Sequence, residues 1–324
     1  MIETNGNELT NYKYIDLFCG IGGFHIALSS FGAQCVFASD IDRYSQDIYE
    51  KNFGMRPNGD IRQIKCKEIP SHDILCAGFP CQPFSISGNQ KGFNDSTGNG
   101  NLFFEIIRIA RFHKPKIIFL ENVSNLEKHD DGKTFDIIKA KLDSIGYYIF
   151  YKNINSSDFG VPQARQRLYI IAIRKNLKIK NFVFPTETNK AICLKDILLN
   201  DSYISDDLFI KRKYILNNKT ILNQSNKLIR IGQIGLGRQG ERIYSVLGHA
   251  TTLSSQSGGL GGQTGMYYIN GRVRKLHPRE CARLMGFPDD YILPKEIRVS
   301  YSKFGNSVVV DVLQYIMKKI IEYL

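Results

Sequence analysis

Short apolar runs alternate with helical patterns through the first half of the chain, and no other feature constrains the fold as strongly. The apolar runs have the length of strands and lie at residues 14–18, 35–38, 74–77, 117–120, 147–154 and 168–173. The helical patterns between them cover residues 24–31, 43–53, 102–112 and 134–145. Strands that alternate with helices at this spacing are typical of a mostly parallel sheet with helices on both faces, so we predict an α/β fold.

The pattern changes after about residue 184. Residues 185–230 are polar with short irregular apolar runs, and residues 232–265 are rich in glycine, which indicates loops carried by a small, strand-poor domain. Residues 308–324 have the pattern of an amphipathic helix that packs back on the first domain. We therefore expect a first domain over residues 1–190, a small irregular domain over 191–303 and a returning C-terminal segment over 304–324.

The chain is basic, because its 324 residues include 43 lysines and arginines against 31 aspartates and glutamates, a net charge of +12. Such a balance favours a polyanionic partner, with nucleic acid first, although a soluble basic protein without that role has the same composition. The seven cysteines are odd in number and form no CxxC pair, and the six histidines form no HxxxH pair. We therefore expect a cytoplasmic protein without disulfides, bound metal, signal peptide or membrane-spanning segment.

A glycine turn follows the first predicted strand and opens the first predicted helix. Residues 16–23 read DLFCGIGG, in which glycine lets the backbone approach a ligand and the helix start offers unpaired N–H groups. Phe18 stands at the strand end, where its ring could stack on a purine. The dinucleotide fingerprint GxGxxG is absent because His25 occupies the third glycine position, which disfavours a nicotinamide oxidoreductase. By itself, such a turn is more commonly structural.

Two acidic residues extend this site. Asp40 ends the second predicted strand and could accept hydrogen bonds from ribose hydroxyls, and Asp60 could accept the exocyclic amine of adenine. No phosphate-binding GxxxxGK[ST] loop is present. A nucleoside cofactor without a pyrophosphate suggests S-adenosylmethionine. The alternative is that both acids are solvated turn residues.

A cysteine lies on the loop just past the strand at 74–77. Residues 78–85 read GFPCQPFS, so Pro80 and Pro83 stiffen the backbone around Cys81. In open α/β sheets ligands bind at this rim, and the polar loop of residues 78–101 is long enough to be functional. A lone free cysteine is more often a small core residue, so the hypothesis of a reactive Cys81 depends on its partners along the chain.

Charged side chains flank two further predicted strands. Glu121 follows the strand at 117–120, where its carboxyl group could exchange a proton, although such an acid is more often a helix cap. Arg165 and Arg167 precede the strand at 168–173 and lie two residues apart, which places them on the same strand face. They suit either a solvated strand end or a phosphate clamp.

Together these motifs resemble the C5-cytosine DNA methyltransferase family. The matching segments occur in the family's order and cover residues 16–23, 78–82, 121–123, 163–167, 279–288 and 305–308. The resemblance implies a Rossmann-like, S-adenosylmethionine-dependent α/β methyltransferase domain with a smaller target-recognition domain, acting on duplex DNA. The short chain and residues 237–245, GRQGERIYS, are most similar to the bacterial HhaI-type enzymes, which implies a GCGC target.

The resemblance also implies roles for single residues. Cys81 would attack cytosine C6, Glu121 would bind N3 and the exocyclic amine, and Arg165 and Arg167 would hold the base and Glu121 in place. The cofactor would be bound by Asp16, Phe18, Gly20, Gly22, Gly23, Asp40, Ile41, Asp60, Ile61, Gly78, Pro80, Leu102, Asn306 and Ser307. The DNA would be contacted by Ser87, Gln239, Glu241, Arg242 and Thr252.

Other hypotheses remain open from the sequence. Some members with this core act on tRNA, so an RNA cytosine methyltransferase is an alternative, and an inactive DNA-binding module is another. The chain departs from the family at Thr97, where an arginine is usual, and at Ile41, where HhaI-type enzymes have a large aromatic residue. We further expect a nucleoid-associated bacterial monomer, with any cognate restriction endonuclease acting separately.

Overall fold

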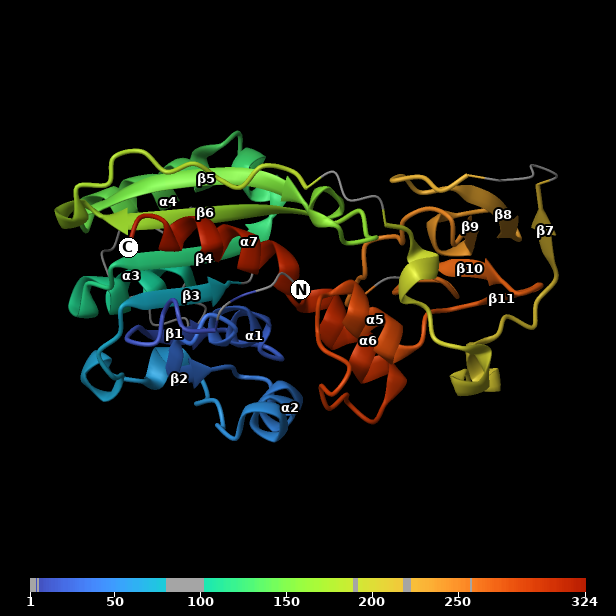
Figure 1. Cartoon of the computed structure of the whole chain (residues 1–324), viewed down its shortest axis with the longest axis horizontal. Helices are drawn as coiled ribbons and strands as arrows, with labels where there is room; N and C mark the ends of the chain where they lie inside the picture. The colour runs from blue at the N-terminus through green and yellow to red at the C-terminus, as the bar shows by residue number, and fades with distance from the viewer. Residues whose placement is uncertain (1–3, 5, 80–101, 189–191, 218–222, 257) are drawn as a thin grey trace.

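The structure is a computed structural model that describes residues 4, 6–79, 102–188, 192–217, 223–256 and 258–324. Figure 1 shows an α/β part built around one sheet and a smaller part built around another. No helix within those ranges is long and apolar enough to cross a membrane. Pro80, Cys81 and Ser87 lie outside the described residues.

The larger sheet has six strands in the order β2-β1-β3-β4-β6-β5. Its strands are β1 (Lys13–Leu17), β2 (Gln34–Ser39), β3 (Ile74–Gly78), β4 (Ile117–Val123), β5 (Tyr147–Asn155) and β6 (Gln166–Arg174). The pairs β1–β2, β1–β3 and β3–β4 are parallel, whereas β6 runs antiparallel to β4 and β5. Only β6 is reversed, which confirms the predicted mostly parallel sheet and brings the carboxyl ends of β1 to β4 to one edge.

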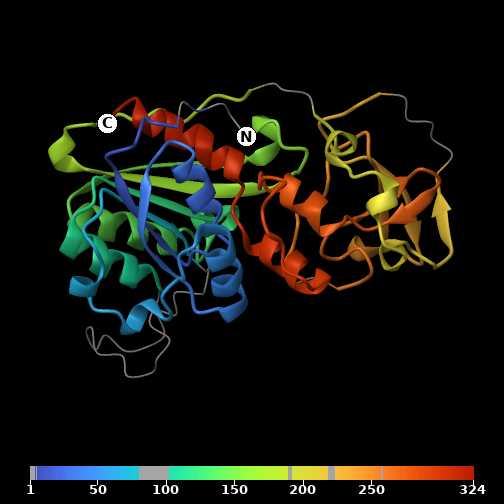
Figure 2. The same cartoon turned by 60° about the horizontal axis from the view of Figure 1, so that its bottom comes forward.

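Helices cover both faces of this sheet, as the sequence predicts. They are α1 (Gly23–Ser29), α2 (Arg43–Phe53), α3 (Leu102–His113), α4 (Lys133–Ser144) and α7 (Val310–Ile321). Helices α1 and α7 pack on one face with Tyr14 and Phe119, while α3 and α4 pack on the other with Ile15 and Leu120. These neighbours in sequence face opposite ways because side chains alternate along a strand. Figures 1 and 2 show the resulting layers.

Local signals set the bounds of α2. Asp42 caps its start, where the side chain accepts the backbone N–H of Ser45 at 2.7 Å. Gly54 ends the helix with a φ of +69°, a left-handed conformation that glycine adopts without strain. Because both signals are visible in the sequence, the observed helix matches the predicted range 43–53.

The smaller part contains a five-stranded sheet in the order β11-β10-β9-β8-β7. Its strands are β7 (Tyr214–Leu216), β8 (Arg230–Ile234), β9 (Arg242–Ser245), β10 (Met266–Ile269) and β11 (Arg272–Arg274). Ile234, Ile243, Met266 and Val273 form its buried core. The sequence indicated loops here, because strands of three to five residues between glycine turns carry too little alternation to be recognised.

Two helices, α5 (Pro278–Leu284) and α6 (Ile297–Asn306), lie between the two parts. Arg274 of β11 and Glu280 of α5 form an ion pair with fully buried side chains and an N–O distance of 2.7 Å. The backbone N–H groups of Leu199 and His277 also donate to Glu280, which satisfies the buried carboxylate. The pair therefore fixes α5 to the smaller sheet. The expected domain boundaries stay a prediction, and the one at residue 303 falls within α6.

Candidate active site

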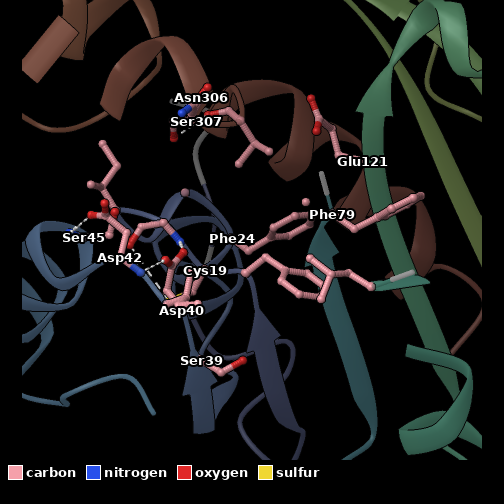
Figure 3. Close-up of a pocket in the computed structure, with 18 of the residues that line it drawn as sticks. Cys19, Phe24, Ser39, Asp40, Asp42, Ser45, Phe79, Glu121, Asn306 and Ser307 are labelled. Atoms are coloured by element: carbon pink, nitrogen blue, oxygen red, sulfur yellow. Dashed lines mark hydrogen bonds between the residues drawn. The ribbon is translucent and has the colours of Figure 1, made fainter. Parts of the chain in front are cut away.

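A cavity of about 660 Å³ opens at the edge where β1 to β4 end. This edge is where open α/β sheets bind ligands, and the volume is in the range of small-molecule sites. Predicted cofactor residues that line it are Phe18, Gly20, Gly23, Asp40, Ile41, Asp60, Ile61, Gly78, Leu102, Asn306 and Ser307. Glu121, Arg165 and Arg167 line it as well. Figure 3 shows Asp40 beside Asp42 on one wall and Glu121 on another.

The glycines of the β1–α1 turn have different roles. Gly20 lines the cavity with a φ of +53° and has open space where a side chain would stand, so its backbone is accessible to a ligand. A Cβ on Gly22 would lie 2.2 Å from the ring of Phe53, and one on Gly23 would lie 2.5 Å from Val308. Gly22 does not line the cavity, so the structure assigns it to packing rather than to the predicted cofactor contact.

Asp16, another predicted cofactor residue, lies behind the cavity rather than on its surface. Its side chain is fully buried and does not line the cavity. Burial raises the pKa of the Asp16 carboxyl well above its ordinary value, and the nearby charge of Asp40 adds to the effect. The contact between Asp16 and the cofactor stays a prediction, and the structure places Asp16 within β1, before the strand reaches the cavity.

Asp40 presents an oriented carboxylate to the cavity. Its Oδ2 accepts the N–H of Gly20 at 2.7 Å, and its Oδ1 accepts the N–H of Asp42 at 2.8 Å. Burial raises the pKa of Asp40, and the two backbone donors and Lys303 oppose that rise. Each carboxylate oxygen can accept more than one hydrogen bond, so Asp40 keeps acceptor capacity for ligand hydroxyls.

Asp60 also lines the cavity, and its carboxylate is paired with Arg62. Arg62 Nε donates to both carboxylate oxygens of Asp60, and Nη2 lies 2.6 Å from Oδ2. These hydrogen bonds lower the pKa of Asp60, which keeps it an acceptor for an amine. Arg62 also lines the cavity and was not among the predicted site residues. Its position two residues after the acid is the signal that could have revealed the pair.

Glu121 and Arg167 form a pair on a different wall of the cavity from Asp40 and Asp42. Glu121 Oε1 lies 3.2 Å from Arg167 Nε, and both side chains are largely buried. Burial raises the pKa of the Glu121 carboxyl, while the charges of Arg167 and Arg165 oppose the rise. Glu121 pairs with Gly78 across the β3–β4 ladder, so it stands at the strand end that leads into the Cys81 loop. The arrangement suits proton exchange or hydrogen bonding to a polar ring.

Arg165 binds two segments that lie far from it in the sequence. Its guanidinium donates to the carbonyl oxygens of Leu253, Gly305 and Ser307 at 3.0, 3.1 and 2.6 Å. Burial lowers the pKa of Arg165 to about 9, with the charge of Arg167 acting in the same direction and Glu121 opposing it. Arg165 therefore acts through position rather than through an exposed charge.

The predicted DNA-contacting residues are divided between the two parts. Thr252 donates to the carbonyl of Ala164, next to Arg165. Gln239 and Glu241 form a short turn before β9, which begins at Arg242. Glu241 accepts the N–H of Arg238 at 2.9 Å, so its carboxylate stabilises its own turn, and its contact with DNA stays a prediction. None of Gln239, Glu241, Arg242 and Thr252 lines the cavity.

Two charged residues that the sequence did not single out line the cavity close to Asp40. Lys303 Nζ lies 2.6 Å from Asp42 Oδ1, and both residues line the cavity. Lys303 precedes the recognised segment at 305–308, but nothing in the sequence pairs it with a residue so distant along the chain. Across the described ranges, no group of three or more acidic, cysteine or histidine side chains could hold a metal ion.

Comparison with known proteins assigns the chain to a family. The sequence model of the family described as C-5 cytosine-specific DNA methylase matches residues 12–322. The chain belongs to this family, whose members transfer a methyl group from S-adenosyl-L-methionine to cytosine C5. The predictions of family, fold class, enzyme activity and cofactor are thereby confirmed.

Particular relatives and solved structures agree with this assignment. The chain is 49% identical over 316 residues to the Type II methyltransferase M.HhaI of Haemophilus parahaemolyticus, which covers 98% of this chain and 96% of that one. It is 40% identical over 320 residues to M.HaeII of Haemophilus aegyptius, covering 98% and 95%. The crystal structure of S. pombe Dnmt2 has a TM-score of 0.69 at 22% identity, covering 96% and 98%, and so shows the same fold.

Proposed function

We propose that this chain methylates C5 of a cytosine within GCGC sites of duplex DNA, as the modification half of a bacterial restriction–modification system. The observation that carries the activity is the buried Glu121–Arg167 pair, which lies at the end of the strand beside the Cys81 loop and in the same cavity as Asp40. The GCGC target rests on the likeness to M.HhaI and on residues 237–245. We infer a monomer acting in the bacterial nucleoid, with any endonuclease separate.

The cavity fits the cofactor at its nucleoside end. Asp40 would accept the ribose hydroxyls, Asp60 the adenine amine, and Phe18 would pack on the purine. The backbone at Gly20 and the residues Asn306 and Ser307 would accommodate the amino-acid end. When bound, S-adenosylmethionine supplies the methyl group that cytosine C5 accepts.

The residues of the chain would activate the cytosine. The Cys81 thiolate attacks C6, a sulfur–carbon bond forms, and the electrons of the C5–C6 double bond make C5 nucleophilic. Glu121, whose carboxyl pKa is raised by burial, donates to N3 and accepts from the exocyclic amine. Arg167 holds Glu121 through their 3.2 Å contact, and Arg165 fixes the surrounding segments. Loss of the C5 proton to a base then expels Cys81.

The target cytosine must leave the helix, because Cys81 cannot reach C6 inside a base stack. Flipping costs a few kcal/mol, on the order of one stacking and pairing interaction. We propose that Gln239 and Ser87 fill the vacated space. Gly240 allows the turn at Gln239–Glu241 to approach Gly258 closely, because a Cβ on Gly240 would lie 2.4 Å from the carbonyl oxygen of Gly258. The five-stranded part would thus present Gln239 and Arg242 to the major groove.

The decisive experiment is bisulfite sequencing of a plasmid treated with the purified protein and S-adenosylmethionine. We expect protection of cytosine at GCGC sites and at no other tetranucleotide. Protection at a different site would retain the activity and overturn the target. Absence of DNA methylation, with methyl transfer to tRNA in a parallel reaction, would favour the RNA methyltransferase hypothesis.

Arg242→Ala should relax specificity at one guanine of the site. A guanidinium that binds guanine O6 and N7 contributes about 1–3 kcal/mol of discrimination, so the ratio of kcat/KM between GCGC and the substituted site should fall about 5- to 150-fold. Oligonucleotide competition measures this ratio. The matched control is Arg272→Ala in the same small sheet, whose guanidinium lies over the ring of Phe209. An equal loss of affinity for all sequences would instead assign Arg242 to phosphate contact.

A further inference from the structure

Lys303 connects two distant segments across one wall of the cavity. Its ammonium group lies 2.6 Å from Asp42 Oδ1, and its side chain is only 13% exposed. Lys303 belongs to α6, whereas Asp42 caps the start of α2 and accepts the N–H of Ser45 with the same oxygen. A lysine whose stem is buried and whose charge meets a carboxylate is fixed in direction, unlike an ordinary surface lysine.

The ion pair is continuous with the carboxylate at the ribose end. The N–H of Asp42 donates to Asp40 Oδ1 at 2.8 Å, so Lys303, Asp42 and Asp40 form a connected chain of polar contacts. Burial alone would raise the pKa of Asp42, but the hydrogen bonds from Lys303 and Ser45 hold it below its ordinary value. The charge of Lys303 also opposes the rise in the pKa of Asp40. Lys303 therefore favours the ionised, hydrogen-bond-accepting form of both carboxylates.

The same lysine sets the position of the segment at the other side of the cofactor. Helix α6 ends at Asn306 and is capped by Ser307, and both residues line the cavity. Helix α2 and the segment before α6 are also held together by two hydrogen bonds between Asn52 and the backbone of Ile292. Loss of the Lys303–Asp42 pair should thus loosen the cavity wall without unfolding the chain.

We propose that Lys303 is a positioning residue for the cofactor, which fastens α6 to α2 across the ribose side of the cavity and holds Asp40 as the acceptor of the ribose hydroxyls. This inference rests on the proposed binding of S-adenosylmethionine in the cavity. It assigns a role to a residue outside the motifs that carry the family resemblance.

Calorimetric titration with S-adenosylhomocysteine, which has the same nucleoside, tests the proposal on the full chain. Lys303→Met removes the charge and keeps the stem, and Asp42→Asn removes the charge and keeps a good helix cap. Each change should weaken binding about five- to tenfold, as expected for the loss of one intramolecular hydrogen bond at a partly solvated site. The double variant should be no more than about twofold weaker than either single variant, because both remove one interaction.

Conservative rescue and a matched control separate position from general structure. Lys303→Arg should bind within about twofold of the unmodified chain, because it restores a charged donor. Lys319→Met removes an exposed lysine paired with Glu322 on α7, and should leave binding unchanged. In steady-state assays, Lys303→Met should act mainly on the KM for S-adenosylmethionine rather than on kcat.

Three results would contradict the proposal or its basis. Binding by Lys303→Met equal to that by Lys319→Met would refute the role of Lys303. Multiplied losses in the double variant would show that Lys303 and Asp42 act independently, which also refutes it. Failure of the unmodified chain to bind S-adenosylhomocysteine would instead refute the use of the cavity for this cofactor.

Discussion

Cys81→Ala is expected to abolish transfer of tritium from labelled S-adenosylmethionine into duplex DNA, with a loss of at least about a thousandfold in kcat. Cytosine C5 is too weak a nucleophile to accept a methyl group unaided, and the addition of a thiolate at C6 is what activates it. Alanine has no group that can form this bond. The cofactor residues and the Glu121–Arg167 pair are unaffected by the change, so binding of DNA and of S-adenosylhomocysteine should persist.

Cys66→Ala provides the matched control for this experiment. Its thiol is half-buried, lies outside the cavity lining and is removed by the same chemical change. A second readout is a covalent complex with DNA that contains 5-fluorocytosine, which should form with the unmodified chain and with Cys66→Ala alone. Equal tritium incorporation by Cys81→Ala and Cys66→Ala would exclude Cys81 as the nucleophile.

Glu121→Gln is expected to lower kcat about 10²- to 10⁴-fold, the range of a lost general acid or base. Glutamine keeps the size of the side chain and most of its hydrogen bonds, but it cannot transfer a proton to N3. Arg167 also loses the carboxylate that lies 3.2 Å from it, so the base is held less firmly. Measured rates of a single turnover report the chemical step, and Glu127→Gln, which changes an acid outside the cavity lining, is the control.

The pH profile gives this prediction a second test. Burial raises the pKa of Glu121, so the protonated form persists to higher pH than in an ordinary glutamate. If that form donates to N3, the rate falls as the pH rises through the raised pKa, and Glu121→Gln lacks this fall because its amide does not titrate. Glu121→Gln with an unchanged profile would assign the ionisation to another group.

Local signals in the sequence were sufficient for several elements but not for their long-range arrangement. Helix α2 was predicted at its observed bounds because Asp42 and Gly54 are neighbours of its ends. The reversal of β6 was not predicted, because an apolar strand reads the same in either direction. The acid at residue 16 was placed in the cofactor site because its motif is contiguous with Gly20, whereas burial in β1 removes it from the cavity.

The candidate site also contains residues that local sequence identifies and residues that only the folded chain brings together. Asp40, Glu121 and Arg167 were identified because each stands near the end of a strand at the binding edge of the sheet. Lys303 was not identified, because its partner lies 261 residues away and only the folded chain brings them together. Sequence patterns report which side chains stand at element ends, while the pairs between distant elements depend on tertiary packing.

The bonds made by Arg165 bear on how new sequence specificities arise in this family. Its guanidinium binds the main-chain carbonyls of Leu253, Gly305 and Ser307, and no side chain of those segments takes part. Substitutions at Leu253 and Ser307 leave their carbonyl acceptors in place as long as the backbone path is kept, whereas Gly305 must stay glycine because a Cβ there would lie 2.3 Å from the backbone of Ser254. A recognition segment from another enzyme could therefore be grafted onto the same catalytic core, and the joint would tolerate divergent sequence around this glycine.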